Sequence, residues 1–205
     1  MTYHVPFEDL GKRGMSLKRE VQRVLQPIDS INVKGWVAGG FLRAHLAGDP
    51  VKDVDLFFRH QEDFDRARAH YEMVAARVYE TDHAVGVEHF SLPNKVDCVE
   101  LVKSHFHPTL FDTLESFDFT ICQVGSDGNG LWVGADFFQD VALRNLRLTG
   151  NVQGWRAIDT LRRAQKYIQL GYTLDATNRV ALYNHIQAGP KVLSSLEPVD
   201  ERASA

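Results

Sequence analysis

Three acidic residues in this sequence have the type and spacing that metal-assisted chemistry requires. Asp53 and Asp55 are separated by one residue in a run whose alternating polar and apolar residues predict a β-strand. Side chains two residues apart on a strand project from the same face, so both carboxylates are able to share divalent cations. Asp97 lies in a second strand-like run and adds a third carboxylate if the two strands pair. Converging carboxylates are the ligands of two-metal phosphoryl transfer.

A glycine pair precedes the acids. Gly39 and Gly40 follow the strand-like run 33–38 and begin a short helical pattern. Glycines at a helix start allow backbone N–H groups to approach a phosphate closely, so we predict that this turn contacts nucleotide phosphates. Arg43 lies in the first turn of the predicted helix, where it either holds a triphosphate or pairs with a carboxylate.

Hydrophobic periodicity predicts the elements that position these residues. Helices are expected at 16–26, where Pro27 ends the pattern, and at 61–77, 155–170 and 176–188. Strands are expected at 33–38, 53–58, 85–92 and 95–102, the last two joined in a hairpin by Pro93-Asn94, and 131–133 and 145–148 are further short candidates. Together they predict an α/β (α+β) fold with a small mixed sheet of about five strands. We expect a catalytic head over 1–150, a helical appendage over 151–190 and a loose tail over 191–205.

Composition limits the classes to which the protein can belong. The 205 residues are 44% hydrophobic and 24% charged, which is typical of a globular protein with a buried core. Two cysteines are too few for a disulfide framework or a four-cysteine zinc site, and the predicted state is two buried, reduced thiols. No segment has the pattern of a signal peptide or a membrane span, so we expect a cytoplasmic protein without a membrane partner.

The charge is unevenly distributed along the chain. A net charge of −4 argues against a protein that coats nucleic acid, yet residues 142–180 are locally basic. In the helix predicted at 155–170, Arg162, Arg163 and Lys166 lie opposite the apolar stripe. This face is either solvated or contacts the phosphates of a nucleic acid.

Four motifs match a known family in order and spacing. Its first motif is matched by Gly39, Gly40, Arg43, Asp53 and Asp55, and the second by Asp118-Phe-Thr-Ile121. Residues 140–148 and 160–172 correspond to two further segments. The sequence therefore resembles the polymerase-beta-like nucleotidyltransferase superfamily, and most specifically the head of tRNA nucleotidyltransferases (CCA-adding enzymes) and bacterial poly(A) polymerases.

The resemblance implies a metal-dependent enzyme that transfers NMP from an NTP to an acceptor hydroxyl. The acceptor would be RNA, including a tRNA 3′ end, with a protein or a small molecule as other acceptors. Two Mg²⁺ ions, or Mn²⁺ in their place, would be held by Asp53, Asp55 and Asp97. Gly39, Gly40, Arg43 and Asp118 would contact the nucleotide. The alternatives are an inactive nucleotide- or RNA-binding module of the same fold, and a toxin-like or regulatory transferase that modifies tRNA or a partner protein.

Some positions depart from the family pattern or permit a structural role. Ser116-Phe117 stands where the family has Arg-Arg, and only about thirty residues follow Gly171, where family members carry further tRNA-recognition domains. Asp118 either contacts the nucleotide or caps a helix.

The identity of the third acid rests on strand alternation. Alternation puts Asp97 and Glu100 on opposite faces of their strand, so only one joins the cluster, and we favour Asp97. His105 and His107 have no cysteine at ligand spacing and are interpreted as loop histidines without a metal.

Overall fold

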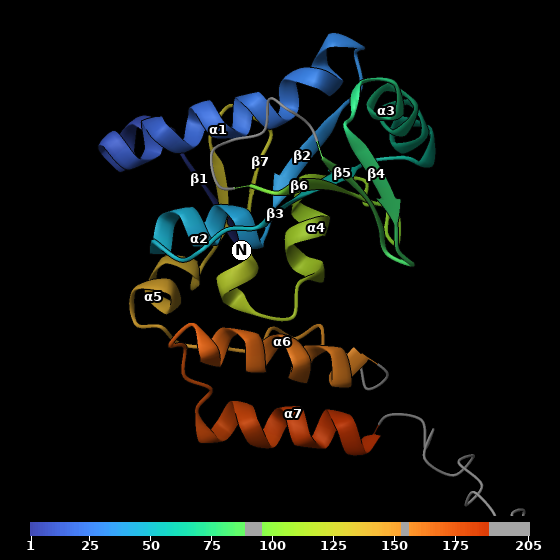
Figure 1. Cartoon of the computed structure of the whole chain (residues 1–205). Helices are drawn as coiled ribbons and strands as arrows, with labels where there is room; N and C mark the ends of the chain where they lie inside the picture. The colour runs from blue at the N-terminus through green and yellow to red at the C-terminus, as the bar shows by residue number, and fades with distance from the viewer. Residues whose placement is uncertain (89–95, 153–155, 189–205) are drawn as a thin grey trace, which may run out of the picture.

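An eight-stranded mixed sheet forms the centre of the computed structural model, which describes residues 1–88, 96–152 and 156–188. Its strands are β1 (Thr2–Val5), β2 (Gly35–Ala38), β3 (Asp53–Phe58), β4 (Arg77–Glu80), β5 (Ala84–Glu88), β6 (Cys98–Val102), β7 (Val124–Ser126) and β8 (Leu131–Gly134). The order across the sheet is β1-β8-β7-β2-β3-β6-β5-β4. β3 and β6 run parallel, whereas the other described neighbours are antiparallel (Figure 1).

The mixed α/β class confirms the prediction from the sequence, but the expected number of about five strands is wrong. β1 and β4 form the two edges of the sheet, and most of their residues are partly or fully exposed. An edge strand exposed on both faces has no alternation of apolar and polar residues, so hydrophobic periodicity does not reveal it. The predicted pairing of the strands around 85–92 and 95–102 is present as β5 and β6, while the turn at Pro93-Asn94 lies outside the described residues.

The described residues form seven α-helices and two short 3₁₀ helices. The helices are α1 (Gly11–Ser30), α2 (Gly40–Ala47), α3 (Gln61–Val74), α4 (Leu110–Ser116), α5 (Phe137–Ala142), α6 (Ala157–Gln169), α7 (Ala176–Ala188), η1 (Phe7–Leu10) and η2 (Thr120–Cys122). None of the described helices combines the length and the apolar character that a bilayer crossing requires.

The first helix is longer than its periodicity predicts. α1 runs to Ser30 with Pro27 inside it, although a proline was expected to end it. Proline removes one intrahelical hydrogen bond. Ile28, immediately after Pro27, is fully buried in the main core, and this burial stabilises the last turn.

The two faces of the sheet are covered by different helices. α1 and α3 pack on one face, where the apolar residues Val54, Leu56, Val99 and Leu101 contribute to the main core. α4 packs on the opposite face through Leu110 and Leu114 against Trp36 and Phe57. Since side chains alternate along β3 and β6, the residues between those core positions face the α4 side of the sheet.

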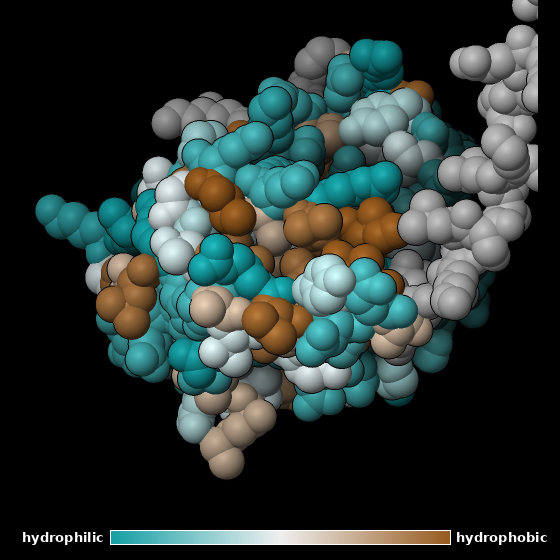
Figure 2. Space-filling model, turned by 90° about the horizontal axis from the view of Figure 1, so that it is seen from below, coloured by the Kyte–Doolittle hydropathy of each residue, from teal (hydrophilic) through white to brown (hydrophobic). Residues whose placement is uncertain are grey.

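A second apolar core lies below the sheet and joins η2 to the last two helices. It includes Phe119, Ile121, Ala164, Tyr167 and Leu182. The predicted division of the chain at residue 150 stays a prediction. Several apolar side chains of α6 and α7 remain exposed, namely Ile158, Leu161, Ile168, Val180 and Tyr183. Apolar side chains are gathered on this lower surface in the view from below (Figure 2).

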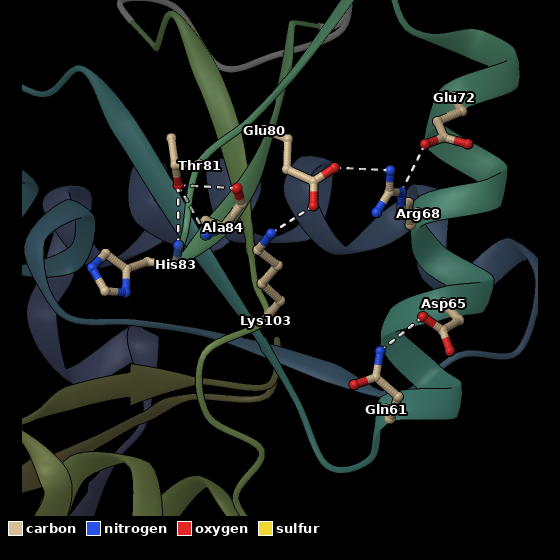
Figure 3. A network of polar contacts seen from close by, with 9 residues as sticks. All are labelled: Gln61, Asp65, Arg68, Glu72, Glu80, Thr81, His83, Ala84 and Lys103. Carbon is tan, nitrogen blue, oxygen red and sulfur yellow. Dashed lines mark hydrogen bonds and ion pairs between the residues drawn. The ribbon is translucent and has the colours of Figure 1, made fainter.

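Ion pairs fasten the outer edge of the sheet to α3. Arg68 on α3 donates to Glu80 of β4 at 3.1 Å, and Lys103 donates to the same carboxylate at 2.5 Å (Figure 3). The β4–β5 turn is closed by Thr81, whose hydroxyl donates to the Ala84 carbonyl. These contacts hold β4 beside β5, and from β4 the Tyr79 ring lies over Gly86 of β5 and its hydroxyl reaches Cys98 of β6.

Candidate active site

The parallel pairing of β3 with β6 brings the acidic residues together. Asp53 lies opposite Cys98, and Asp55 lies opposite Glu100. The apolar residues between them point into the main core, so these four side chains share the α4 face of the sheet. Two adjacent strands therefore present three carboxylates and a thiol side by side.

Direct contacts connect part of this cluster. One ligand atom from each of Asp53, Cys98 and Glu100 lies within 4.8 Å of the other two. The Cys98 thiol donates a hydrogen bond to Asp53 Oδ1 at 3.3 Å. The Tyr79 hydroxyl is 3.1 Å from the same sulfur. Among the described residues this is the one group of three potential metal ligands that converge so closely.

The carboxylates of the cluster destabilise one another's charged forms. The pKa of Asp55 is raised to about 7, mainly because burial disfavours its charge and secondarily because Glu100 and Asp53 repel it. The pKa of Glu100 is also raised, first by burial and then by Asp53. Lys166 on α6 attracts both carboxylates and opposes these shifts. A divalent cation at this position would reverse the repulsion.

Glu100, rather than Asp97, is the third carboxylate that the structure brings to this cluster. β6 begins at Cys98, so Asp97 lies one residue outside the paired segment, and its backbone N–H donates to the Lys52 carbonyl. Asp97 is exposed, whereas Glu100 is half-buried beside Asp55. The preference for Asp97 in the sequence analysis is therefore corrected. Alternation correctly separates Asp97 from Glu100, but it does not show which side of β6 faces Asp53.

The glycine turn lies at the end of β2, the neighbour of β3. Gly39 has φ +83°, a conformation that favours glycine, and its N–H donates to the Val124 carbonyl at 2.8 Å. A Cβ on Gly39 would lie 3.4 Å from the Phe117 ring. At Gly40, which begins α2, a Cβ would meet nothing within 4 Å. The first turn of α2 is thus open to a ligand on the Gly40 side, and Phe117 packs against the Gly39 side.

Arg43 is engaged in a buried ion pair, one of the two alternatives that its position allowed. Its guanidinium donates to Asp49 at 2.8 Å, and both side chains are about 5% exposed or less. It also donates to the Tyr172 hydroxyl and lies over the Tyr167 ring, 4.8 Å from its centroid. Arg144 donates to the same Asp49 carboxylate at 2.5 Å. These contacts connect α2 to the segments that follow α5 and α6.

Asp118 is held by an ion pair to α6. Its carboxylate accepts hydrogen bonds from Arg163 at 2.6 and 2.8 Å. The N-cap of the following η2 helix is Phe119, so Asp118 does not cap that helix. The other two basic residues differ from Arg163. Arg162 pairs with Asp159 on the exposed surface, whereas the positive charge of Lys166 lowers the pKa of Asp55 in the acidic cluster. The three residues predicted as one basic face therefore have three environments.

The matched segment 140–148 begins with a buried acid that organises the backbone. Asp140 is fully buried and accepts hydrogen bonds from Thr120, Asn145 and Arg147 at 2.6, 2.9 and 3.1 Å. These bonds fix the segment after α5 against η2. The matched segment 140–148 thus has a structural role in joining the two cores.

His105 and His107 lie away from any described metal-ligand group. Their rings are stacked with centroids 6.2 Å apart, and burial lowers the pKa of each. His105 contacts Arg156. No described cysteine or carboxylate joins them in a converging group of three.

Sequence reasoning passed over Cys98 and Tyr79 as site residues. Cys98 was interpreted as a buried thiol, which it is at 3% exposure, yet it contacts Asp53. Tyr79 lies on the edge strand β4, which periodicity did not predict. The sequence does place Cys98 next to Asp97 in the strand-like run that contains the candidate third acid, and this adjacency could have identified it.

Solved structures of CCA-adding enzymes share this fold. The Thermotoga maritima CCA-adding enzyme complexed with tRNA superposes with a TM-score of 0.59 and 17% identity, over 92% of this chain and 47% of that one. The Bacillus stearothermophilus enzyme in complex with CTP gives 0.55 and 18%, over 82% and 42%. A CCA-adding enzyme with ATP gives 0.61 and 17%, over 92% and 48%. The chain spans about half the length of these enzymes, and at these identities the likeness establishes the nucleotidyltransferase-head fold predicted from the sequence.

Comparisons at the sequence level give a family. No curated protein matches the sequence. A family model described as "Gabija anti-defense 2 family protein" matches residues 15–144, a segment that contains β3, β6, the glycine turn and all three clustered carboxylates. Because this match covers well over half of the chain, the protein belongs to the Gabija anti-defense 2 family.

Proposed function

We propose that this chain is a divalent-metal-dependent nucleotidyltransferase that transfers NMP from an NTP to an acceptor hydroxyl on RNA. The observation that carries the proposal is the acidic cluster of Asp53, Asp55 and Glu100. Among the described residues, no arginine or lysine lies within ion-pair distance of these carboxylates. Partly buried carboxylates that repel one another are costly unless a cation joins them.

The donor set fits Mg²⁺, which prefers oxygen ligands and retains several waters. Asp53, Asp55 and Glu100 would hold the metal, which supplies charge neutralisation at the phosphates and activation of the acceptor hydroxyl when bound. The raised pKa of Asp55, about 7 without a cation, supports a site that becomes fully ionised only when a positive charge is present. Mn²⁺ is the alternative ion.

Other residues of the chain would bind and orient the nucleotide. The open side of Gly40 and the first turn of α2 provide backbone N–H groups for the phosphates. Lys166, which attracts the Asp55 carboxylate, would add a positive charge for the nucleotide phosphates. Arg43 would not contact the triphosphate, because its guanidinium is committed to Asp49. Asp118 would act through Arg163, which it holds in place on α6.

The fold neighbours support an NTP and RNA as the reactants. Their structures contain CTP, ATP or tRNA. Transfer to a tRNA 3′ end by this chain, in the cytoplasm, is the form of the reaction closest to theirs.

The family assignment favours a second candidate of the same chemistry. The family is described by its action against Gabija defense. A regulatory transferase that attaches NMP to a hydroxyl of a Gabija component, or to an RNA on which that system depends, would link the acidic cluster to this description. The two candidates differ in the acceptor and not in the metal site.

A labelling assay tests both candidates. The purified chain is incubated with Mg²⁺ and each α-³²P-labelled NTP, once with total tRNA and once with purified Gabija proteins. Label on RNA supports the first candidate, and label on protein supports the second. Absence of label from both acceptors with all four NTPs would refute the transferase.

Matched variants connect the label to the site. Asp53→Asn should reduce transfer by about a thousandfold or more, because a lost metal ligand removes several kcal/mol of transition-state stabilisation. Asp97→Asn makes the same chemical change at an exposed residue outside the β3–β6 pairing. Its transfer rate should stay within about twofold of that of the unsubstituted protein. Equal losses in both variants would contradict the assignment of Glu100 as the third acid.

A further inference from the structure

The acidic cluster contains a donor that oxygen-binding metals do not use. Asp53, Cys98 and Glu100 bring one ligand atom each within 4.8 Å of one another, whereas Asp55 is outside this group. Mg²⁺ binds oxygen, but thiolate sulfur is a ligand of Zn²⁺ and similar softer cations. Asp53 thus belongs to two overlapping donor sets, one composed of oxygens and one that includes sulfur.

The chain places the thiol toward Asp53 through several specific features. Pairing with β3 sets Cys98 directly opposite Asp53. On the other side, the Tyr79 ring lies over Gly86, where a side chain on residue 86 would collide with the ring. This position brings the Tyr79 hydroxyl to 3.1 Å from Cys98 Sγ. The sulfur is therefore held between a carboxylate that could share a metal and a hydroxyl that could stabilise its anion, an arrangement that orients and tunes metal ligands.

We propose that Asp53, Cys98 and Glu100 form a binding site for a thiophilic divalent cation, with Zn²⁺ as the ion of choice. Two carboxylate oxygens, one thiolate and one water give Zn²⁺ its four ligands. In the metal-free protein the thiol carries its proton and donates it to Asp53 Oδ1. Binding forms the sulfur–metal bond and releases the thiol proton to solvent, so charge and atoms balance without an oxidant or a reductant.

The two donor sets compete because both use Asp53. A Zn²⁺ ion bound to the sulfur-containing set withdraws Asp53 from the oxygen set that Mg²⁺ requires. Zn²⁺ would therefore inhibit nucleotidyl transfer, and this consequence alone rests on the proposed function. Metal binding itself is measurable in a protein without any transfer activity.

Cobalt substitution tests the site directly. Co²⁺ is added to the EDTA-treated, dialysed chain, and the near-ultraviolet band of thiolate-to-cobalt charge transfer is recorded. We expect a band at one equivalent that disappears when Zn²⁺ is added. Cys98→Ser should abolish the band, while Cys122→Ser, which removes the other buried thiol, should retain it. A missing band in the unsubstituted chain, or a band that persists in Cys98→Ser, would overturn the proposal.

Two further variants make the result independent of folding defects and of transfer activity. Glu100→Gln preserves the side-chain shape and should weaken Zn²⁺ binding, measured by competition with a chromophoric chelator, by about tenfold or more. Unchanged affinity would count against the site. Asp55→Asn should lose Mg²⁺-dependent transfer but retain the cobalt band. A band without transfer in the unsubstituted chain refutes the proposed function alone, and transfer without a band refutes the thiol site alone.

Discussion

Two regions of the molecule contain buried or half-buried acids, and their surroundings are opposite. At the Arg43–Asp49 junction, the Asp49 carboxylate accepts from Arg43, Arg144 and the Tyr172 hydroxyl and is 5% exposed. In the acidic cluster, Asp53, Asp55 and Glu100 face one another, and among the described residues Lys166 supplies the attraction that opposes the raised pKa values of Asp55 and Glu100. In the first region the carboxylate is already paired with guanidinium groups, whereas the second contains mutually repelling carboxylates that an added cation would neutralise.

This contrast separates structural charge from functional charge. A buried ion pair costs much to break, because removal of one partner leaves the other charge without solvent or a counter-ion. A cluster of like charges costs stability for as long as it is empty, and it is retained where function requires it. Substitutions in the two regions should therefore change stability in opposite directions.

The largest effect on stability is expected at the junction. Arg43→Ala should lower the free energy of unfolding by about 3–5 kcal/mol, since it leaves Asp49 buried with half of its cationic partners. Chemical denaturation monitored by tryptophan fluorescence measures the change. The control is Arg162→Ala, which removes an exposed pair with Asp159 and should cost about 0.5 kcal/mol or less. Similar losses in both variants would show that the junction is not held by its charges.

A gain in stability is expected in the acidic cluster. Asp55 has a pKa of 3.8 when unfolded and about 7 when folded, so its ionisation is harder in the folded state. Folded stability is therefore highest below pH 3.8, decreases as the pH rises toward 7, and is then constant with respect to this group. In EDTA at pH 8, Asp55→Asn should raise the free energy of unfolding by about 1–2 kcal/mol, because the amide carries no charge.

The metal dependence of the same variant sharpens the comparison. Addition of Mg²⁺ should stabilise the unsubstituted protein and have a smaller effect on Asp55→Asn, since one ligand is lost. Thermal unfolding in EDTA and in Mg²⁺ across pH 4–8 measures both effects. A lower stability of Asp55→Asn than of the unsubstituted protein at pH 8 in EDTA would show that burial and repulsion do not destabilise the Asp55 carboxylate.

The sequence predicts the acidic cluster better than the Arg43–Asp49 junction. Asp53 and Asp55 share a face because alternation on a strand is local, and the glycine turn is local as well. The third acid could not be identified in the same way, because the choice between Asp97 and Glu100 depends on the register of two strands that are over 40 residues apart. Register is decided by which apolar residues enter the core, and Val99 and Leu101 do so here.

The Arg43–Asp49 junction depends on contacts between residues far apart in the sequence, which no local pattern predicts. Arg43 is separated by 129 residues from Tyr172, and Asp49 by 95 from Arg144. Local spacing thus allowed Arg43 two roles and could not choose between them. Likewise, the edge strands β1 and β4 are specified by pairing with β8 and β5 and have little pattern of their own. The central strands and helices were predictable, whereas edges and long-range ion pairs required the folded chain.

The smallest of the expected effects concerns an ion pair that lies between the two extremes. Asp118 is about 10% exposed, but its partner Arg163 is 47% exposed, so solvent already screens much of their attraction. Arg163→Gln should lower the free energy of unfolding by about 0.5–1 kcal/mol and leave metal affinity unchanged, which calorimetric titration with Mn²⁺ can verify. If Asp118 also contacts the nucleotide, the same variant should weaken NTP binding as the carboxylate loses its orientation. A loss of stability as large as that of Arg43→Ala would instead show that the Asp118–Arg163 pair stabilises the fold as strongly as the buried Arg43–Asp49 pair.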